Sequence, residues 1–267
     1  MDIIAKHNDI PIAVIGDVHG EWDLITNRIK KYNLDNIIIF QAGDFGVGFN
    51  YNNPVEPKKE NKRLAIMNNS LKKRNIFLYV VRGNHDNPSF FDGDHNFSNI
   101  IFMQDYDVVQ IGEYMVLGIG GSTSVDRKEN PNFKDYRGKI HGGRREGIDW
   151  WPLAEKVAYN EEKLAKIAGV DMVVMHTAPS FIFPPVLGSV ILKWCQYDSE
   201  LKDELIAERE VVAKIYNKLN EFNFIRFWYY GHFHNKNQQR HDITEFRLLD
   251  IGEFAEVRFG QEEDSIE

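Results

Sequence analysis

Several features are scarce in this sequence of 267 residues, and their absence excludes whole classes of protein. Its one cysteine, Cys195, cannot form a disulfide within the chain, which agrees with a reducing compartment and predicts a packing role. No apolar run approaches ~18 residues, so the sequence predicts no transmembrane helix. Residues 1–9 lack a long apolar segment and a small-residue cleavage site, so we expect no signal peptide and a cytoplasmic location.

Positive charge is scarce as well. The chain has 32 lysine and arginine residues against 40 aspartate and glutamate residues, which gives a formal net charge of −8 at pH 7. We therefore expect neither long duplex nucleic acid nor a membrane as a partner. A small phosphorylated substrate, such as a nucleotide, stays compatible with this charge, because bound divalent cations make one small region positive.

Short apolar runs recur along the chain and predict strands. They lie at residues 11–15, 37–40, 76–81, 99–103, 107–111, 114–119, 171–175, 224–230, 243–249 and 254–259. Amphipathic segments predict helices at 21–32, 58–74, 160–168 and 201–222. The first runs alternate with helices, which is typical of βαβ units and a largely parallel sheet. The runs from 99 to 119 have no helix between them and predict a meander or a second sheet.

One connection is too long to be an ordinary loop. Residues 120–151 are rich in glycine and charge, which predicts a lid or substrate loop whose cations meet phosphate. The alternative is a solvated loop with two buried tryptophans, Trp150 and Trp151. We find no linker, so we predict a single domain over residues 1–260, followed by an acidic, disordered tail at 261–267.

Seven polar side chains directly follow predicted strands, and this placement predicts a metal site. They are Asp17, His19, Asp44, Asn84, His176, His232 and His234. The carboxyl ends of parallel strands meet at one edge of a sheet, so five loops would bring these donors together. A set of oxygen and imidazole donors without thiolate suits Mn²⁺, with Fe, Zn²⁺ or Ni²⁺ as alternatives. Alone, each signal is weak, since a single histidine after a strand is more often structural.

The order of the motifs closely resembles that of the calcineurin-like metallophosphoesterase superfamily over residues 11–234. The motifs are Gly16-Asp-Val-His-Gly20, Gly43-Asp-Phe45, Gly83-Asn-His-Asp86, His176 and Gly231-His-Phe-His234. Segments 120–127 and 149–152 also resemble bacterial and phage members. The resemblance implies an α/β fold, a four-layer α-β-β-α sandwich of two mixed sheets with a dinuclear metal site at the strand C-terminal edge.

The resemblance also implies a role for each candidate residue. It implies two metal ions that share a bridging carboxylate, Asp44. The remaining ligands would be Asp17, His19 and His234 on one ion, and Asn84, His176 and His232 on the other. A hydroxide that bridges two divalent ions would then attack the phosphorus atom.

Three residues beside the ligands are candidates for catalysis. His85 follows a candidate ligand and is better suited to act as the general acid for the leaving oxygen. Asp86 is a candidate to hold the tautomer of His85, with capping of the next turn as the alternative. Arg82 is a candidate phosphate clamp, with a surface ion pair as the alternative.

The second motif decides between branches of the superfamily. Protein phosphatases continue it as Gly-Asp-x-x-Asp-Arg-Gly, whereas residues 43–49 here contain no arginine. The closing motif at 231–234 is similar to those of phosphodiesterases, nucleases and nucleotidases. We therefore expect hydrolysis of a phosphodiester or phosphomonoester, with the diester favoured. The alternatives are a serine/threonine-type protein phosphatase and a non-catalytic scaffold with the same fold.

Overall fold

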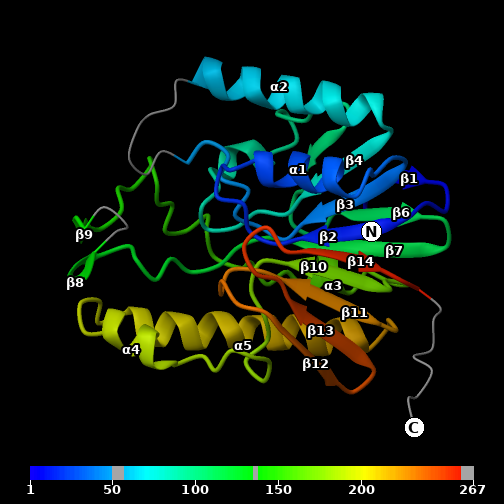
Figure 1. The fold of residues 1–267 in the computed structure, drawn as a ribbon. Coiled ribbons are helices and arrows are strands. Elements are labelled where there is room, and N and C mark those ends of the chain that lie inside the picture. Colours follow the sequence, from blue (N-terminus) through cyan, green and yellow to red (C-terminus); the bar gives the residue numbers. More distant parts are fainter. Residues whose placement is uncertain (50–56, 135–137, 260–267) are drawn as a thin grey trace, which may run out of the picture.

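The computed structural model describes residues 1–49, 57–134 and 138–259, and these form two central sheets (Figure 1). The first sheet has five strands in the order β14 (Phe254–Val257), β2 (Ile12–Ile15), β3 (Ile37–Gln41), β4 (Ile76–Val80) and β5 (Ile100–Phe102). The second has seven, in the order β1 (Ile3–His7), β6 (Val108–Ile111), β7 (Tyr114–Ile119), β10 (Met172–Met175), β11 (Phe227–Tyr230), β13 (Thr244–Leu248) and β12 (Asn237–His241). The predicted acidic tail at 261–267 lies outside the described residues.

Both sheets are mixed. In the five-stranded sheet, β2 to β5 are parallel and β14 pairs antiparallel with β2. In the seven-stranded sheet, the pairs β6–β7 and β12–β13 are antiparallel and the other neighbours are parallel. The strands that carry the motifs, β2, β3, β4, β10 and β11, each have at least one parallel neighbour, as their continuous apolar runs predicted.

Helices cover the outer faces of the two sheets, as Figure 1 shows. On the five-stranded side lie α1 (Asp23–Lys31) and α2 (Pro57–Lys73), and α1 buries Ile25 and Ile29 against the strands. On the seven-stranded side lie α3 (Glu161–Leu164), α4 (Ser189–Trp194) and the long α5 (Leu201–Asn220). Apolar side chains from both sheets, among them Phe40 and Tyr229, fill the space between them. The predicted four-layer α-β-β-α sandwich is therefore confirmed.

Some elements were not predicted because they carry no apolar run. Strand β12 reads Asn-Gln-Gln-Arg-His and lies at the edge of its sheet, where polar side chains reach solvent. The loop at 120–151 contains a hairpin of β8 (Glu129–Lys134) and β9 (Ile140–Gly142). The helix expected at 160–168 is reduced to the single turn of α3. Cys195 is half-buried beside Trp194, in agreement with a packing role.

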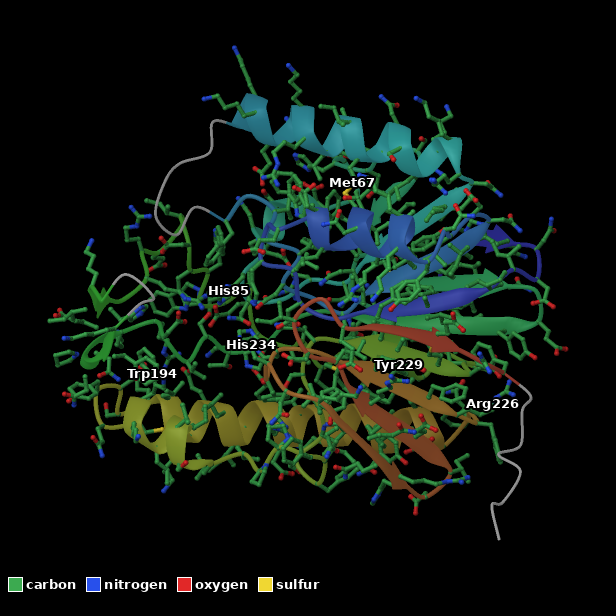
Figure 2. All side chains as sticks on the ribbon, in the orientation of Figure 1. Met67, His85, Trp194, Arg226, Tyr229 and His234 are labelled. Carbon is green, nitrogen blue, oxygen red and sulfur yellow. The ribbon has the colours of Figure 1, made fainter. Side chains whose placement is uncertain are left out.

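Every helix among the described residues is too short or too polar to cross a bilayer. The loops that follow β2, β3, β4, β10 and β11 meet at one end of the two sheets. Figure 2 places His85 and His234 at this end, on the side of the sheets that faces the β8–β9 hairpin. The candidate site lies there.

Candidate metal centre

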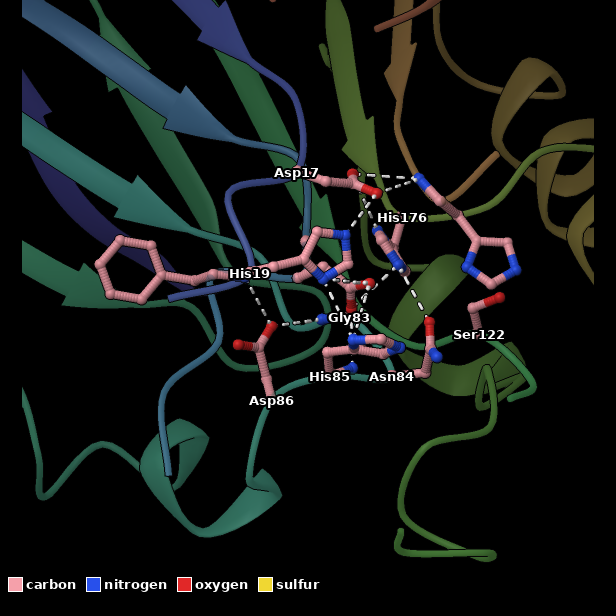
Figure 3. A network of polar contacts seen from close by, with 12 residues as sticks. Asp17, His19, Gly83, Asn84, His85, Asp86, Ser122 and His176 are labelled. Atoms are coloured by element: carbon pink, nitrogen blue, oxygen red, sulfur yellow. Dashed lines mark hydrogen bonds and ion pairs between the residues drawn. The ribbon is translucent and has the colours of Figure 1, made fainter. Parts of the chain in front are cut away.

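The structure brings the seven predicted ligands together from five loops. Asp17 and His19 follow β2, Asp44 follows β3, and Asn84 follows β4. His176 follows β10, and the last two histidines, His232 and His234, follow β11. Figure 3 shows most of these side chains pointing toward one another in a network of polar contacts. Their proximity follows from the parallel strands, as the sequence predicted.

The donor atoms fall into two groups that share one carboxylate. Within each group, one donor atom per residue lies within 4.8 Å of the others. The groups are Asp17, His19, Asp44 and His234, and Asp44, His176 and His232. Asp44 therefore stands at the junction, where the resemblance placed a bridging ligand.

The second group is preorganised by hydrogen bonds outside it. Nδ1 of His176 donates to the carbonyl of Ala42 at 2.8 Å, so Nε2 is the nitrogen that faces the group and would coordinate an ion. That Nε2 lies 3.2 Å from Oδ1 of Asp44 and 3.2 Å from Oδ1 of Asn84. The Asn84 amide is oriented by its Nδ2, which donates to Ser124 Oγ at 3.2 Å. Asn84 thus presents its oxygen to the group, as a ligand requires.

The first group is more open to solvent. Nε2 of His234 lies 2.9 Å from Nε2 of His19 and 3.3 Å from Oδ2 of Asp17. The Asp17 carboxylate also accepts the backbone N–H of His232, with both oxygens 3.1 Å from the nitrogen. One carboxylate therefore fixes the loop after β11 and still faces the histidines.

Four of these residues have left-handed backbone conformations that non-glycine residues rarely adopt. The φ angles are +47° at His19, +57° at Asp44, +69° at His232 and +43° at His234. Such conformations cost about 1–3 kcal/mol each and persist where the surroundings impose them, often at functional sites. Here they turn the side chains toward the common point.

Electrostatics within the cluster favour a bound cation. Burial opposes ionisation of Asp44, but His176 and His85 hold its pKa well below the ordinary value. Burial disfavours the charged form of His176, but Asp44 and Asp17 outweigh burial and raise the pKa of His176 to about 10. In this state a proton on His176 offsets the carboxylates, and a metal ion would replace that proton. Oxygen and imidazole donors that converge on shared points fit divalent metal ions.

Two glycines let the loops approach closely. A Cβ on Gly83 would lie 2.2 Å from both the backbone nitrogen and Oδ1 of Asp44. A Cβ on Gly231 would lie 2.1 Å from Oδ1 of Asp17. Because no Cβ tolerates such contacts, each carboxylate can occupy its place only when the neighbouring loop has glycine there.

His85 lies beside the cluster, between it and the long loop. Its Nδ1 is 3.0 Å from Nδ1 of His19 and 4.0 Å from Oδ2 of Asp44. Its ring stacks on Phe49, with centroids 4.6 Å apart and an interplanar angle of 7°. Its Nε2 contacts the guanidinium of Arg144. Burial, with the charge of Arg144, holds the pKa of His85 well below the ordinary value.

The predicted role of Asp86 in holding His85 is wrong. The buried carboxylate of Asp86 instead accepts four backbone N–H groups, which belong to Phe45, Gly46, Val47 and Gly83, at 2.6–3.2 Å. Asp86 therefore ties the loop after β3 to the loop after β4. This arrangement is nearer to the capping alternative, and it acts on the backbone that carries Asp44.

The structure also corrects the phosphate clamp predicted at Arg82. Its side chain is buried, and its guanidinium pairs with Asp105 at 3.1 Å and donates to the carbonyl of Ala154. These contacts place the Arg82 charge in a structural ion pair. The alternative predicted a surface ion pair, but the arginine side of this pair is buried.

Two residues at the site, Ser124 and Glu155, were not singled out from the sequence, and a third, Arg144, was considered only as one of the cations of the long loop. Ser124 Oγ accepts from Arg144 Nη1 at 2.8 Å and donates to Glu155 Oε2 at 2.7 Å. The same hydroxyl accepts from Asn84, so all of its hydrogen-bonding capacity is used. The region has no apolar periodicity, and only its unusual length and charge marked it as functional.

Comparisons with known proteins were made on the sequence and on the structure. A family model described as calcineurin-like phosphoesterase matches residues 10–236. No curated protein matches the sequence. A dimetal phosphatase structure from Danio rerio matches at 12% identity, with 91% of this chain and 88% of that chain covered and a TM-score of 0.46. A phosphopantetheinyl hydrolase from Mycobacterium tuberculosis matches at 12% identity, with 91% of each chain covered and a TM-score of 0.44.

We expect Gly83→Ala to damage the cluster without touching a ligand. The added methyl group collides with Asp44, so metal content should fall and the protein should lose about 1–3 kcal/mol of unfolding free energy. The matched control is Gly188→Ala, whose added Cβ meets nothing within 4 Å. Metal analysis and denaturant unfolding provide the measurements. Normal metal content in Gly83→Ala would contradict the close approach.

We expect Asp44→Asn to impair metal binding more than His234→Asn does. Asp44 belongs to both groups and His234 to one. The loss of affinity should exceed the roughly 10–100-fold that removal of a supporting contact costs. Titration of the metal-free proteins with Mn²⁺ measures this. Two tightly bound ions in Asp44→Asn would show that the carboxylate is not shared.

Proposed function

Because the chain belongs to the calcineurin-like phosphoesterase family, whose model spans residues 10–236, we propose that it is a dinuclear metal-dependent phosphoesterase. Family membership implies a hydrolase that acts on phosphoesters. The observation that carries the finer proposal is the pair of donor groups joined at Asp44. Each group has room for one ion, and a shared carboxylate offsets the repulsion between two dications.

The chain's own residues would hold the two ions as the resemblance implies. Asp17, His19 and His234 would bind one ion, Asn84, His176 and His232 the other, and Asp44 both. Mn²⁺ is our first choice, with Fe, Zn²⁺ or Ni²⁺ as alternatives. When bound, such a pair lowers the pKa of a water molecule and withdraws charge from phosphate oxygens.

His85 would give a proton to the leaving oxygen of the substrate. Its ring borders the cluster and is held flat against Phe49, so an ester bound over the cluster has its leaving group beside the imidazole. Burial and Arg144 disfavour the protonated form of His85 in the free protein. A bound phosphate anion would favour it, because an opposite charge at close range raises the pKa of an imidazole.

The two alternatives have less support. Where the second motif of protein phosphatases has its arginine, the chain has Gly48. The next residue, Phe49, stacks on His85 and makes that wall of the site apolar. This favours a diester or a nucleotide-like leaving group over a phosphorylated protein. A non-catalytic scaffold would not need the ordered set of seven donors together with His85.

The partners stay proposals supported by composition. A net charge of −8 is compatible with a small phosphorylated substrate, such as a nucleotide, because two bound cations would make the site locally positive. The same charge does not favour long duplex nucleic acid. We also retain the cytoplasmic location as a proposal.

We expect the Mn²⁺-loaded protein to hydrolyse bis(p-nitrophenyl) phosphate at least as fast as p-nitrophenyl phosphate. The reason is the apolar wall formed by Phe49, which suits a second ester group. Release of p-nitrophenolate measures both rates, and cyclic nucleotides, dinucleotides and phosphopeptides extend the comparison. Full turnover by verified metal-free protein would overturn the proposed function, and a strict preference for phosphopeptides would favour the phosphatase alternative.

We expect His85→Asn to slow substrates in proportion to their need for an acid. An alkoxide leaving group, as in a nucleoside diester, should lose about 10²-fold or more in kcat, whereas p-nitrophenyl esters should lose much less. His95→Asn, at an exposed position paired with Asp92, is the control. Metal content is measured alongside, because a drop would mean that His85 is a ligand. Equal losses on both leaving groups would reject the acid.

A further inference from the structure

One cation of residues 120–151 reaches the candidate site, and the backbone explains why. Arg144 follows β9, directly after Gly143, which has a left-handed φ of +75°. Its backbone N–H donates to the carbonyl of Arg127 at 3.1 Å, and Arg127 precedes β8. The two arginines therefore close the base of the β8–β9 hairpin, which lies at the left in Figure 1.

The base of the hairpin is fixed to the body of the protein. The Arg127 guanidinium is buried and pairs with Asp198 at 2.5 Å and with Glu204 of α5. Because the backbones of Arg127 and Arg144 are hydrogen-bonded, this anchor also fixes the start of the Arg144 side chain. Arg144 is thus placed partly by structure outside the ligand loops.

The Arg144 side chain is nearly buried, with 1% of its surface exposed, and it runs toward the ligand loops. Nη1 donates to Ser124 Oγ at 2.8 Å and to the carbonyl of Asn84 at 3.3 Å. Nη2 contacts His85 Nε2 and forms an ion pair with Asp126. The guanidinium therefore touches one candidate ligand residue and the candidate acid.

One donor of the Arg144 guanidinium has no acceptor. Nη1 donates to Ser124 and the Asn84 carbonyl, and Nη2 contacts His85 and Asp126. In the part of the chain that the structure describes, Nε of Arg144 is buried without a hydrogen-bond partner. A guanidinium nitrogen can only donate, so this position calls for an acceptor. A phosphate oxygen supplies the acceptor that this arrangement lacks.

Among the described residues, four other cations near the site have partners outside the ligand cluster. Arg82 pairs with Asp105, and Arg127 with Asp198 and Glu204. Arg145, the next residue along, points to Asp149 at 2.7 Å, and its side chain is 56% exposed. Lys128 lies 5.7 Å from the ring centroid of Trp150. Arg137 lies outside the described residues.

We propose that Arg144 binds a non-bridging oxygen of the substrate phosphate, on the His85 side of the metal centre. This rests on the proposed function and adds a specificity-determining residue to it. The guanidinium fork holds the phosphate in the orientation that places the leaving oxygen at His85. Ser124 and the Asn84 carbonyl hold Nη1, and a phosphate oxygen would meet the guanidinium at Nε and take the place of Asp126 at Nη2.

A purely structural role for Arg144 gives a different expectation. If its contacts only hold the long loop, replacing it changes unfolding and leaves the affinity for phosphate unaltered in the folded fraction. If it binds phosphate, the affinity falls even where the fold and the metal content are kept. Inorganic phosphate is the probe that separates the two, because its binding requires no turnover.

The experiment is calorimetric titration of the Mn²⁺-loaded protein with inorganic phosphate. We expect Arg144→Ala to weaken phosphate binding by about tenfold or more, since a charge-assisted hydrogen bond is lost. Arg144→Lys, which keeps the charge but loses the fork, should lie between Arg144→Ala and the wild type. Arg145→Ala removes the same charge from the neighbouring position and should bind as the wild type does. Metal content and thermal unfolding are measured for each protein.

Unchanged phosphate affinity in folded, metal-loaded Arg144→Ala would overturn the inference, as would a wild-type protein that binds no phosphate. Should Arg144→Ala not fold, Arg144→Lys decides, and wild-type affinity in it overturns the inference. The proposed function is tested separately by turnover of bis(p-nitrophenyl) phosphate. Turnover with phosphate binding that is independent of Arg144 means that the inference alone has failed. Phosphate binding that depends on Arg144, without turnover, means that the proposed function alone has failed.

Discussion

The position of the Asp44 carboxylate is the constraint on which the rest of the site depends. Its Oδ1 accepts the backbone N–H of His85 at 2.7 Å and faces Nε2 of His176, while Oδ2 faces His19 at 3.7 Å. A buried carboxylate is costly unless it is fully compensated, and here the surrounding imidazoles or bound cations compensate it. The loop that carries it is held by a second buried carboxylate, Asp86, through backbone N–H groups. One acid thus provides charge at the site and the other fixes where that charge lies.

Strand periodicity and residues placed at strand ends predicted the parallel α/β class and the location of the site, and the resemblance of the motifs implied the four-layer arrangement. That is why Asp17 and Asp44 could be brought to one edge before any coordinates were known. The role of a residue one step further along depends on what faces it across another loop, which the sequence does not specify. Asp86 and Arg82 were misassigned for this reason: their partners, Gly46 and Asp105, come from other loops.

Residues 120–155 show the same limit on a larger scale. Their length and charge indicated function, but their shape depends on two buried carboxylates. Glu155 accepts from the backbone and hydroxyl of Ser124, and Glu208 of α5 accepts from Ser122 at 3.2 Å and from the backbone of Thr123. Burial raises the pKa of both acids. These bonds tie the segment to the outer helix α5, and Ser124 also contacts Asn84. The end of the segment nearest the site is therefore an ordered wall of the site.

The two donor groups draw on both sheets, and this couples the site to the core. The group that contains Asp17 and His19 is completed by His234 from the seven-stranded sheet, and the group of His176 and His232 is completed by Asp44 from the five-stranded sheet. Each bound ion would therefore link the sheets at one end of the apolar layer that holds them together. Binding energy at such a link adds to the stability of the packed state, because the unfolded chain does not present these donors together. The same linkage works in reverse: a defect in the layer between the sheets shifts one half of each donor group against the other and weakens metal binding at a distance.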